Sequence, residues 1–200
     1  MVNAKRLWHK QGVMPPQRSH HQAERRPKPL LTAAKLDELA LHYVGRFATS
    51  RAKLVDYLRR KLRERGWEGD EMPDLVAIAE RLADYGYIDD ASFAVAKARS
   101  LGARGYGARR VGQALHAAGI DQDDGGEARA LAHDQRVDAA LKMAKRRRVG
   151  PYATAPLDPP QREKAIAAML RAGHGFALSR AIVELPPGYS IDPVFLGELR

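Results

Sequence analysis

The sequence predicts an all-α fold of short helices arranged as tandem three-helix repeats. Apolar residues recur at spacings of three and four from Thr32 onward, with almost no alternating stretches. A second observation is a motif of leucine, three residues, glycine and a large apolar residue, which is typical of a helix that ends in a left-handed glycine. The motif occurs at 62–67, 82–87 and 115–120, with a distorted copy at 170–176.

Three helices are expected before residue 88. The first spans 32–47. Ser50 can cap the second, because its hydroxyl can accept an amide hydrogen bond, and Gly66 ends it. Pro73 suits the first position of the third helix, where an N–H would be unpaired anyway. The expected buried residues are Leu36, Leu39, Ala40, Tyr43, Leu54, Leu58, Leu62, Leu75, Ile78 and Leu82.

The next three helices are expected to start near acidic residues. Asp89 or Asp90 can cap the fourth helix, and we prefer this role to a metal site because adjacent carboxylates suit a helix start. The fifth helix spans about 108–118, and the sixth begins near Asp123 or Asp124. Their expected buried residues are Phe93, Val111 and Leu115.

Three further helices are expected towards the C-terminus. The seventh ends in the basic run 145–148, whose charge favours a helix C-terminus. A proline-rich loop then separates it from an eighth helix at about 161–172. A short ninth helix at 177–185 stops at Pro186.

The spacing between matching residues predicts the repeat. Arg46 precedes Gly66 by 20 residues, and Arg99 precedes Gly119 by 20. Gly173 follows Gly119 by 54 residues. We divide the chain into an arm (1–31), repeats at 32–88, 89–133 and 134–186, and a C-terminal tail (187–200); the third repeat is degenerate, with a proline-rich insertion at 149–160. Stacked units predict an elongated, curved body.

The chain is strongly basic, with a net charge of +10 and an isoelectric point near 10.0. More than half of this charge lies in the arm, which holds seven basic residues, one acid and four prolines, and which we predict to be disordered. A partner with negative charge is expected. The sequence has no cysteine and no apolar run of membrane-spanning length, so we expect no disulfides, no membrane partner and a cytoplasmic location.

Basic residues are the candidate partner-binding residues. They crowd the polar side of the second helix and flank the start of the fifth, where Tyr106 lies among them. The set comprises Arg59, Arg60, Arg63, Arg65, Arg99, Arg104, Arg109 and Arg110. Each taken singly also fits a solvated helix face.

Catalytic motifs are missing from the sequence. It contains no phosphate-binding loop, no His-Glu-x-x-His pair and no nucleophile elbow, and its histidines are scattered over different elements. We therefore expect no enzyme activity, no metal site and no cofactor.

One stretch carries a family resemblance. The order Gly86-Tyr87-Ile88-Asp89-Asp90, Phe93-Ala94, Arg99, Gly107, Arg109, Leu115 and Gly119-Ile120 resembles the RecX family of regulatory proteins, which are bacterial modulators of the RecA recombinase. The resemblance covers about 32–185, and the first unit agrees through Leu54, Leu58, Leu62 and Gly66. The third unit departs from it, because Gly173-His174-Gly175-Phe176 stands where the family has an Arg-Arg-Gly-aromatic run.

The resemblance implies a non-enzymatic protein that lies in the groove of the RecA nucleoprotein filament. There it would limit filament growth and inhibit ATP hydrolysis and strand exchange, with the basic faces contacting acidic protein surface or DNA phosphates. The alternative is a direct DNA-binding regulator of helix-turn-helix type, since such motifs also join short helices through a glycine turn. A nuclease would need clustered carboxylates, which the sequence does not predict. Stacked repeats with capped ends do not require a dimer, so we expect a monomer.

Overall fold

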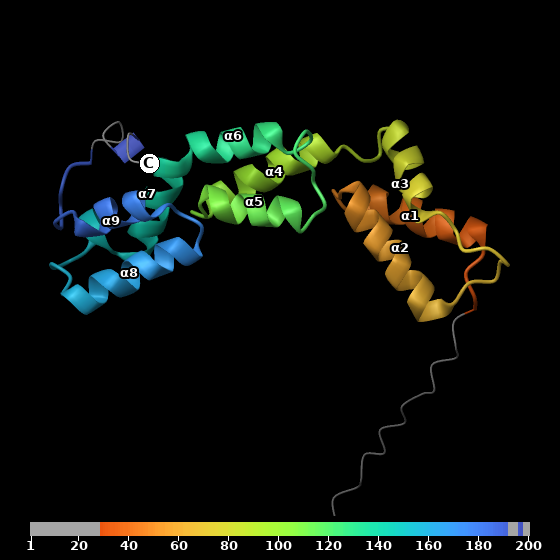
Figure 1. Ribbon diagram of the computed structural model, residues 1–200, viewed down its shortest axis with the longest axis horizontal. Coiled ribbons are helices and arrows are strands. Elements are labelled where there is room, and N and C mark those ends of the chain that lie inside the picture. Colours follow the sequence, from red (N-terminus) through yellow and green to blue (C-terminus); the bar gives the residue numbers. More distant parts are fainter. Residues whose placement is uncertain (1–28, 192–195, 198–200) are drawn as a thin grey trace, which may run out of the picture.

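The computed structural model describes residues 29–191 and 196–197. Residues 1–28, which carry all seven basic residues of the arm, lie outside the described residues, as do 192–195 and 198–200 of the C-terminal tail. The predicted disorder of the arm falls on these residues. Within the described ranges the chain forms helices and a single isolated bridge between Leu31 and Trp67. The all-α prediction is confirmed, and Figure 1 shows an elongated arrangement of the helices.

The helices follow the expected order with small shifts in their ends. They are α1 (Ala33–Arg46), α2 (Arg51–Arg65), α3 (Leu75–Asp84), α4 (Asp90–Ala103), α5 (Ala108–His116), α6 (Gly126–Asp134), α7 (Arg136–Arg147), the 3-10 turn η1 (Gly150–Tyr152), α8 (Pro159–Arg171) and α9 (Phe176–Glu184). Figure 1 places α1–α3 at one end, α4–α6 in the middle and α7–α9 at the other end.

The first hydrophobic core joins α1, α2 and α3. Thr32 and Ser50 cap α1 and α2 through side-chain oxygens that accept amide hydrogen bonds, as the sequence predicts for Ser50. The placement of Pro73 at the first position of α3 is wrong, because Asp74 is the cap and Pro73 precedes it. The buried residues are Leu31, Leu36, Ala40, Leu54, Val55, Leu58, Leu62, Ile78, Ala79, Leu82 and Ile88.

The second core joins α4, α5 and α6. Asp89 caps α4 by accepting the amide of Ser92, which confirms the capping role predicted for this aspartate. The helix α6 starts at Gly126, later than expected, because a hydrogen-bonded turn around Asp121 precedes it. The buried residues are Ala94, Val95, Ala98, Leu101, Val111, Leu115, Ala118, Ile120 and Ala128.

The third core joins α7, α8 and α9. The proline-rich segment contributes to it, since Tyr152 and Leu157 pack against its buried residues. The helix α8 starts two residues before the expected position, because Asp158 and Gln161 form a reciprocal capping box. Tyr106 packs against both the second and the third core and so links them.

The helices α2, α5 and α8 meet end to end through the predicted glycine turns. Ser50, the cap of α2, donates its hydroxyl to the carbonyl of Ala118 at 2.6 Å. Gly119 has a φ of +69° and lies so close to Ala52 that a β-carbon there would overlap it. The C-terminal turn of α5 therefore packs on the N-terminus of α2.

The same arrangement recurs between α8 and α5. The amide of Gly107 donates to the carbonyl of Ala172 at 2.9 Å, and the amide of Arg109 donates to the carbonyl of Gly173 at 3.2 Å. Gly173 has a φ of +94°, and a β-carbon on it would overlap the backbone of Arg110. The first amides and the last carbonyls of a helix have no hydrogen-bond partner within that helix. Here the free carbonyls at the end of α8 accept hydrogen bonds from the free amides at the start of α5. Figure 1 shows α8, α5 and α2 following one another along the long axis.

The segment before α1 occupies the corresponding place at the end of α2. The amide of Leu31 donates to the carbonyl of Gly66 at 3.1 Å, and Leu31 is fully buried in the first core. The arm boundary drawn after residue 31 is therefore too late, because Leu31 belongs to the folded body. Its burial depends on the glycine turn of α2, which lies 35 residues away in the sequence.

An ion-pair network fixes the first junction. The carboxylate of Asp90 accepts the amide of Arg51 at 3.0 Å and its Nε at 2.9 Å, and the guanidinium also contacts Asp124 at 2.6 Å. The hydrogen bond from Arg51 to Asp90 is the main cause that raises the pKa of Arg51 above its ordinary value. Asp90, one of the two predicted caps of α4, instead links α4 to α2.

Candidate interaction surface

The predicted arginines of α2 form an exposed basic face on which most cations have local partners. Arg59 pairs with Asp56 at 2.6 Å, Arg60 lies 3.7 Å from Glu64, and Arg65 donates to the carbonyl of Pro29 at 3.1 Å. These exposed pairs are weak and a partner could replace them at little cost. Arg63 is exposed and has no ion pair or hydrogen bond with the described residues.

An aromatic pair borders this face. Tyr43 of α1 stacks on Tyr57 of α2, with ring centroids 4.2 Å apart and planes inclined by 16°. The cations of Arg60 and Lys61 lie 5.6 and 5.7 Å from the centroid of the Tyr57 ring. The sequence analysis missed this contact, although Tyr57, Arg60 and Lys61 are spaced as neighbours on one helix.

A second basic cluster lies where the second and third cores meet. The guanidinium of Arg104 lies 5.2 Å from the ring centroid of Tyr106. Arg146 of α7 donates to the carbonyl of Arg104, so a residue that the prediction omitted joins the cluster. Arg109 and Arg110 lie exposed in the first turn of α5, directly beside the docked turn of α8. Within the described chain, the side chain of Arg109 has no ion pair or hydrogen bond.

The eight predicted arginines therefore fall into two clusters and one isolated residue. Four lie on α2, and three others lie around the start of α5. Arg99 is exposed on α4 and is joined to neither set by a contact within the described ranges. Whether these residues bind a partner stays a prediction. Among the described residues there is no group of three histidine, cysteine or acidic side chains placed to hold a metal ion.

His174 is buried at the same boundary and makes one hydrogen bond. Its Nε2 donates to the carbonyl of Gly105 at 3.1 Å, whereas Nδ1 is buried without a partner in the described chain. Burial lowers the pKa of His174 from its ordinary value of 6.5, because a charged ring would be poorly solvated there.

We expect this histidine to make stability depend on pH. The unfolded chain protonates His174 near its ordinary pKa of 6.5, whereas the folded chain protonates it at lower pH. The free energy of unfolding should be at its full value above this pH and should decrease as the pH falls towards the folded pKa, by at most about 1.4 kcal/mol per pH unit. Urea unfolding between pH 7.5 and 5 measures the slope. His174→Gln should flatten it; an unchanged slope in this variant would show that other groups cause it.

Comparisons with known proteins agree with this architecture. A family model described as "RecX, second three-helix domain" matches residues 89–128, which include α4, α5 and the glycine turn at the first junction. The regulatory protein RecX of Myxococcus xanthus is 27% identical over 180 residues, which cover 86% of this chain and 96% of that protein. The regulatory protein RecX of Xanthomonas oryzae pv. oryzae is 33% identical over 130 residues, 65% of this chain and 78% of that protein.

The chain belongs to the RecX family. The crystal structure of RecX from Lactobacillus salivarius has the same fold, with a TM-score of 0.53 and 22% identity over 76% of this chain and 94% of that one. The residues 89–128 that match the family model include Asp90 and Gly119 at the first junction and Gly107 at the second. No helix within the described ranges is both long and apolar enough to cross a membrane.

Proposed function

We propose that the chain binds the RecA recombinase filament and mainly inhibits its growth, its ATPase activity and its strand exchange. Membership of the RecX family carries this proposal, because its relatives are named regulatory proteins. We also propose that the protein acts by binding and not by catalysis, as a regulator of DNA repair and recombination.

The geometry of the basic surfaces supports such a role. The elongated body presents cations on α2 and around the start of α5, and these two places belong to different cores. Contacts at separated places along one chain add through effective concentration, so several weak contacts can give a useful affinity. Arg63 and Arg109 suit this role best, since no described side chain neutralises either of them.

We expect charge reversal at these two arginines to weaken inhibition. The double variant Arg63→Glu, Arg109→Glu should need about tenfold more protein to inhibit the single-stranded-DNA-dependent ATPase of the cognate RecA, a loss of about 1.4 kcal/mol. The measurement is a titration of RecA with each protein, with binding to the same DNA without RecA recorded at the same salt concentration.

The matched control is Arg162→Glu, Lys164→Glu on α8. Both residues are exposed, and the double variant changes the net charge equally outside the predicted surface. Equal losses in the two variants would show that net charge matters and that the proposed residues do not. Inhibition by the wild type only when the DNA is saturated would instead support a direct DNA-binding protein.

A further inference from the structure

A groove lined by both apolar and charged side chains lies beside the junction of the first two cores. It has a volume of about 450 Å3 and runs between the start of α2, α3 and the turn that follows α5. Ala52, Val55 and Ala79 contribute to its lining. Val76 also lines it and is 53% exposed, which is unusual for a valine next to a hydrophobic core. The groove therefore offers apolar surface to an occupant.

The charge of this groove is opposite to that of the whole protein. Four carboxylates line it, from Asp56, Glu80, Asp90 and Asp121. The two lining arginines are neutralised, since Arg59 pairs with Asp56 and Arg51 pairs with Asp90 and Asp124. Glu80 and Asp121 have no ion pair with a described residue, so they leave negative charge at the groove.

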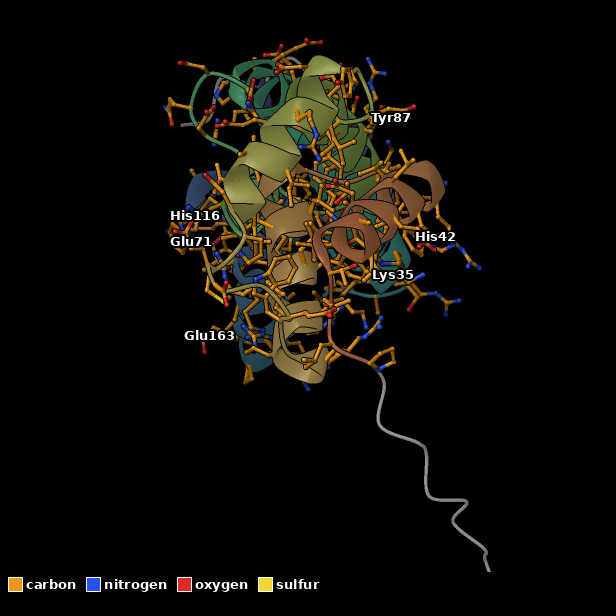
Figure 2. The ribbon with its side chains drawn as sticks, turned by 90° about the vertical axis from the view of Figure 1, so that its right-hand side faces the viewer. Lys35, His42, Glu71, Tyr87, His116 and Glu163 are labelled. Carbon is orange, nitrogen blue, oxygen red and sulfur yellow. The ribbon has the colours of Figure 1, made fainter. Side chains whose placement is uncertain are left out.

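The surface around the groove is acidic as well. Residues 68–84 contain six acids and one arginine, and residues 119–127 contain four acids. The guanidinium of Arg129 donates to the carbonyls of Asp121 and Gln122 and offsets part of that charge. Figure 2 shows Glu71 and His116, from the α2–α3 loop and the end of α5, towards one side of the view, whereas Lys35 and His42 of α1 lie towards the other. At the groove itself the unpaired acids are Glu80 of α3 and Asp121 of the turn after α5.

We propose that this groove binds the chain's own N-terminal arm. The arm carries seven basic residues against one acid within 1–28, which complements the unpaired carboxylates. Residues 5–14 combine three cations and no acid with four apolar side chains, Leu7, Trp8, Val13 and Met14. This composition matches an apolar groove with acidic edges, and the Trp8 ring can cover Val76.

The arm joins the folded body close enough to the groove for residues 5–14 to reach it. Arg65 at the end of α2 donates to the carbonyl of Pro29, and the groove begins six residues earlier on α2, at Arg59, about 9 Å away along the helix axis. Fourteen residues separate Met14 from Pro29, and a flexible linker of that length spans about 20 Å root-mean-square, enough to reach the groove. The tether then provides an effective concentration on the order of millimolar, so a weak contact suffices.

Fluorine NMR of the full-length chain labelled with 5-fluorotryptophan tests the contact. The chain contains two tryptophans, and Trp8→Phe assigns their resonances. We expect the Trp8 resonance of the wild type to differ from that of a synthetic peptide of residues 1–28. The double variant Glu80→Lys, Asp121→Asn reverses the charge at position 80 and removes it at position 121. We therefore expect the Trp8 resonance of this variant to move to its position in the peptide.

Two controls separate loss of the contact from loss of the fold. Asn at 121 retains an oxygen that can accept the amide of Asp124, and the resonance of Trp67 reports whether the first core remains folded. The control Glu163→Lys, on α8, should leave the Trp8 resonance unchanged (Figure 2). A wild-type Trp8 signal at the peptide position would overturn the proposal. A shift that disappears on dilution would overturn it too, because the arm would then bind a second copy.

Discussion

Replacing Gly173 by alanine is expected to lower the free energy of unfolding by about 2–5 kcal/mol. A left-handed backbone costs a residue with a β-carbon about 1–2 kcal/mol, and overpacking a close contact costs about 1–3 kcal/mol more. Gly173 meets both conditions, since its φ is +94° and its missing β-carbon makes room for the backbone of Arg110. Urea unfolding followed by circular dichroism measures the loss.

Two other glycines separate the contribution of backbone strain from that of packing. Gly188 has a φ of +76° but nothing within 4 Å of a β-carbon, so Gly188→Ala should cost only the strain of about 1–2 kcal/mol. Gly175 has an ordinary φ of −68° and open space, so Gly175→Ala should change stability by less than about 1 kcal/mol. If Gly173→Ala costs no more than Gly188→Ala, the close approach of α8 to α5 contributes nothing to stability.

Removing the carboxylate of Asp90 is expected to cost about 2–3 kcal/mol. Its side chain is 5% exposed, and Asp90→Ala would leave the Arg51 amide without its acceptor and remove one of the two carboxylates that hold the guanidinium. An unsatisfied buried donor costs about 1–3 kcal/mol, and the ion pair adds little more because Arg51 is 43% exposed. Urea unfolding gives the free energy difference.

Two variants test this explanation of the Asp90 effect. Asp90→Asn keeps an oxygen that can accept the amide of Arg51, so it should cost less than Asp90→Ala. Asp37→Ala breaks the exposed ion pair between Asp37 and Arg81 and should cost less than about 1 kcal/mol. Equal losses for Asp37→Ala and Asp90→Ala would show that the Asp90 contact acts as an ordinary surface ion pair.

The helices and their ends were largely predictable because their causes are local. Ser50 and Asp89 cap the helices as expected, and Gly66, Gly86, Gly119 and Gly173 all have positive φ angles. Leucines at helical spacing were predicted to be buried, and Leu54, Leu58 and Leu115 are fully buried. Caps, glycine turns and apolar periodicity depend on residues within about one turn, so the sequence contains their signal.

The sequence predicted which arginines are candidate site residues, but it did not predict which contacts each of them makes. Clusters of arginine indicated basic faces, but helical spacing alone allows several ion pairs and does not determine that Arg59 pairs with Asp56 while Arg63 has no described partner. It also missed Arg146, which lies 42 residues after Arg104 and contacts its carbonyl. A long side chain can contact any of several neighbouring groups, and the packing of the elements determines which contact forms.

The sequence by itself determined the helical class, most helix ends, the spacing of the units and the basic charge, because these follow from local chemistry and composition. The tertiary structure decided how the units join. Gly119 packs on Ala52 and Gly173 on Arg110, over 60 residues away, and Asp90 binds Arg51 instead of acting as a cap. Such contacts form only when helix ends distant in the chain come within a few ångströms, and neither periodicity nor charge specifies that approach.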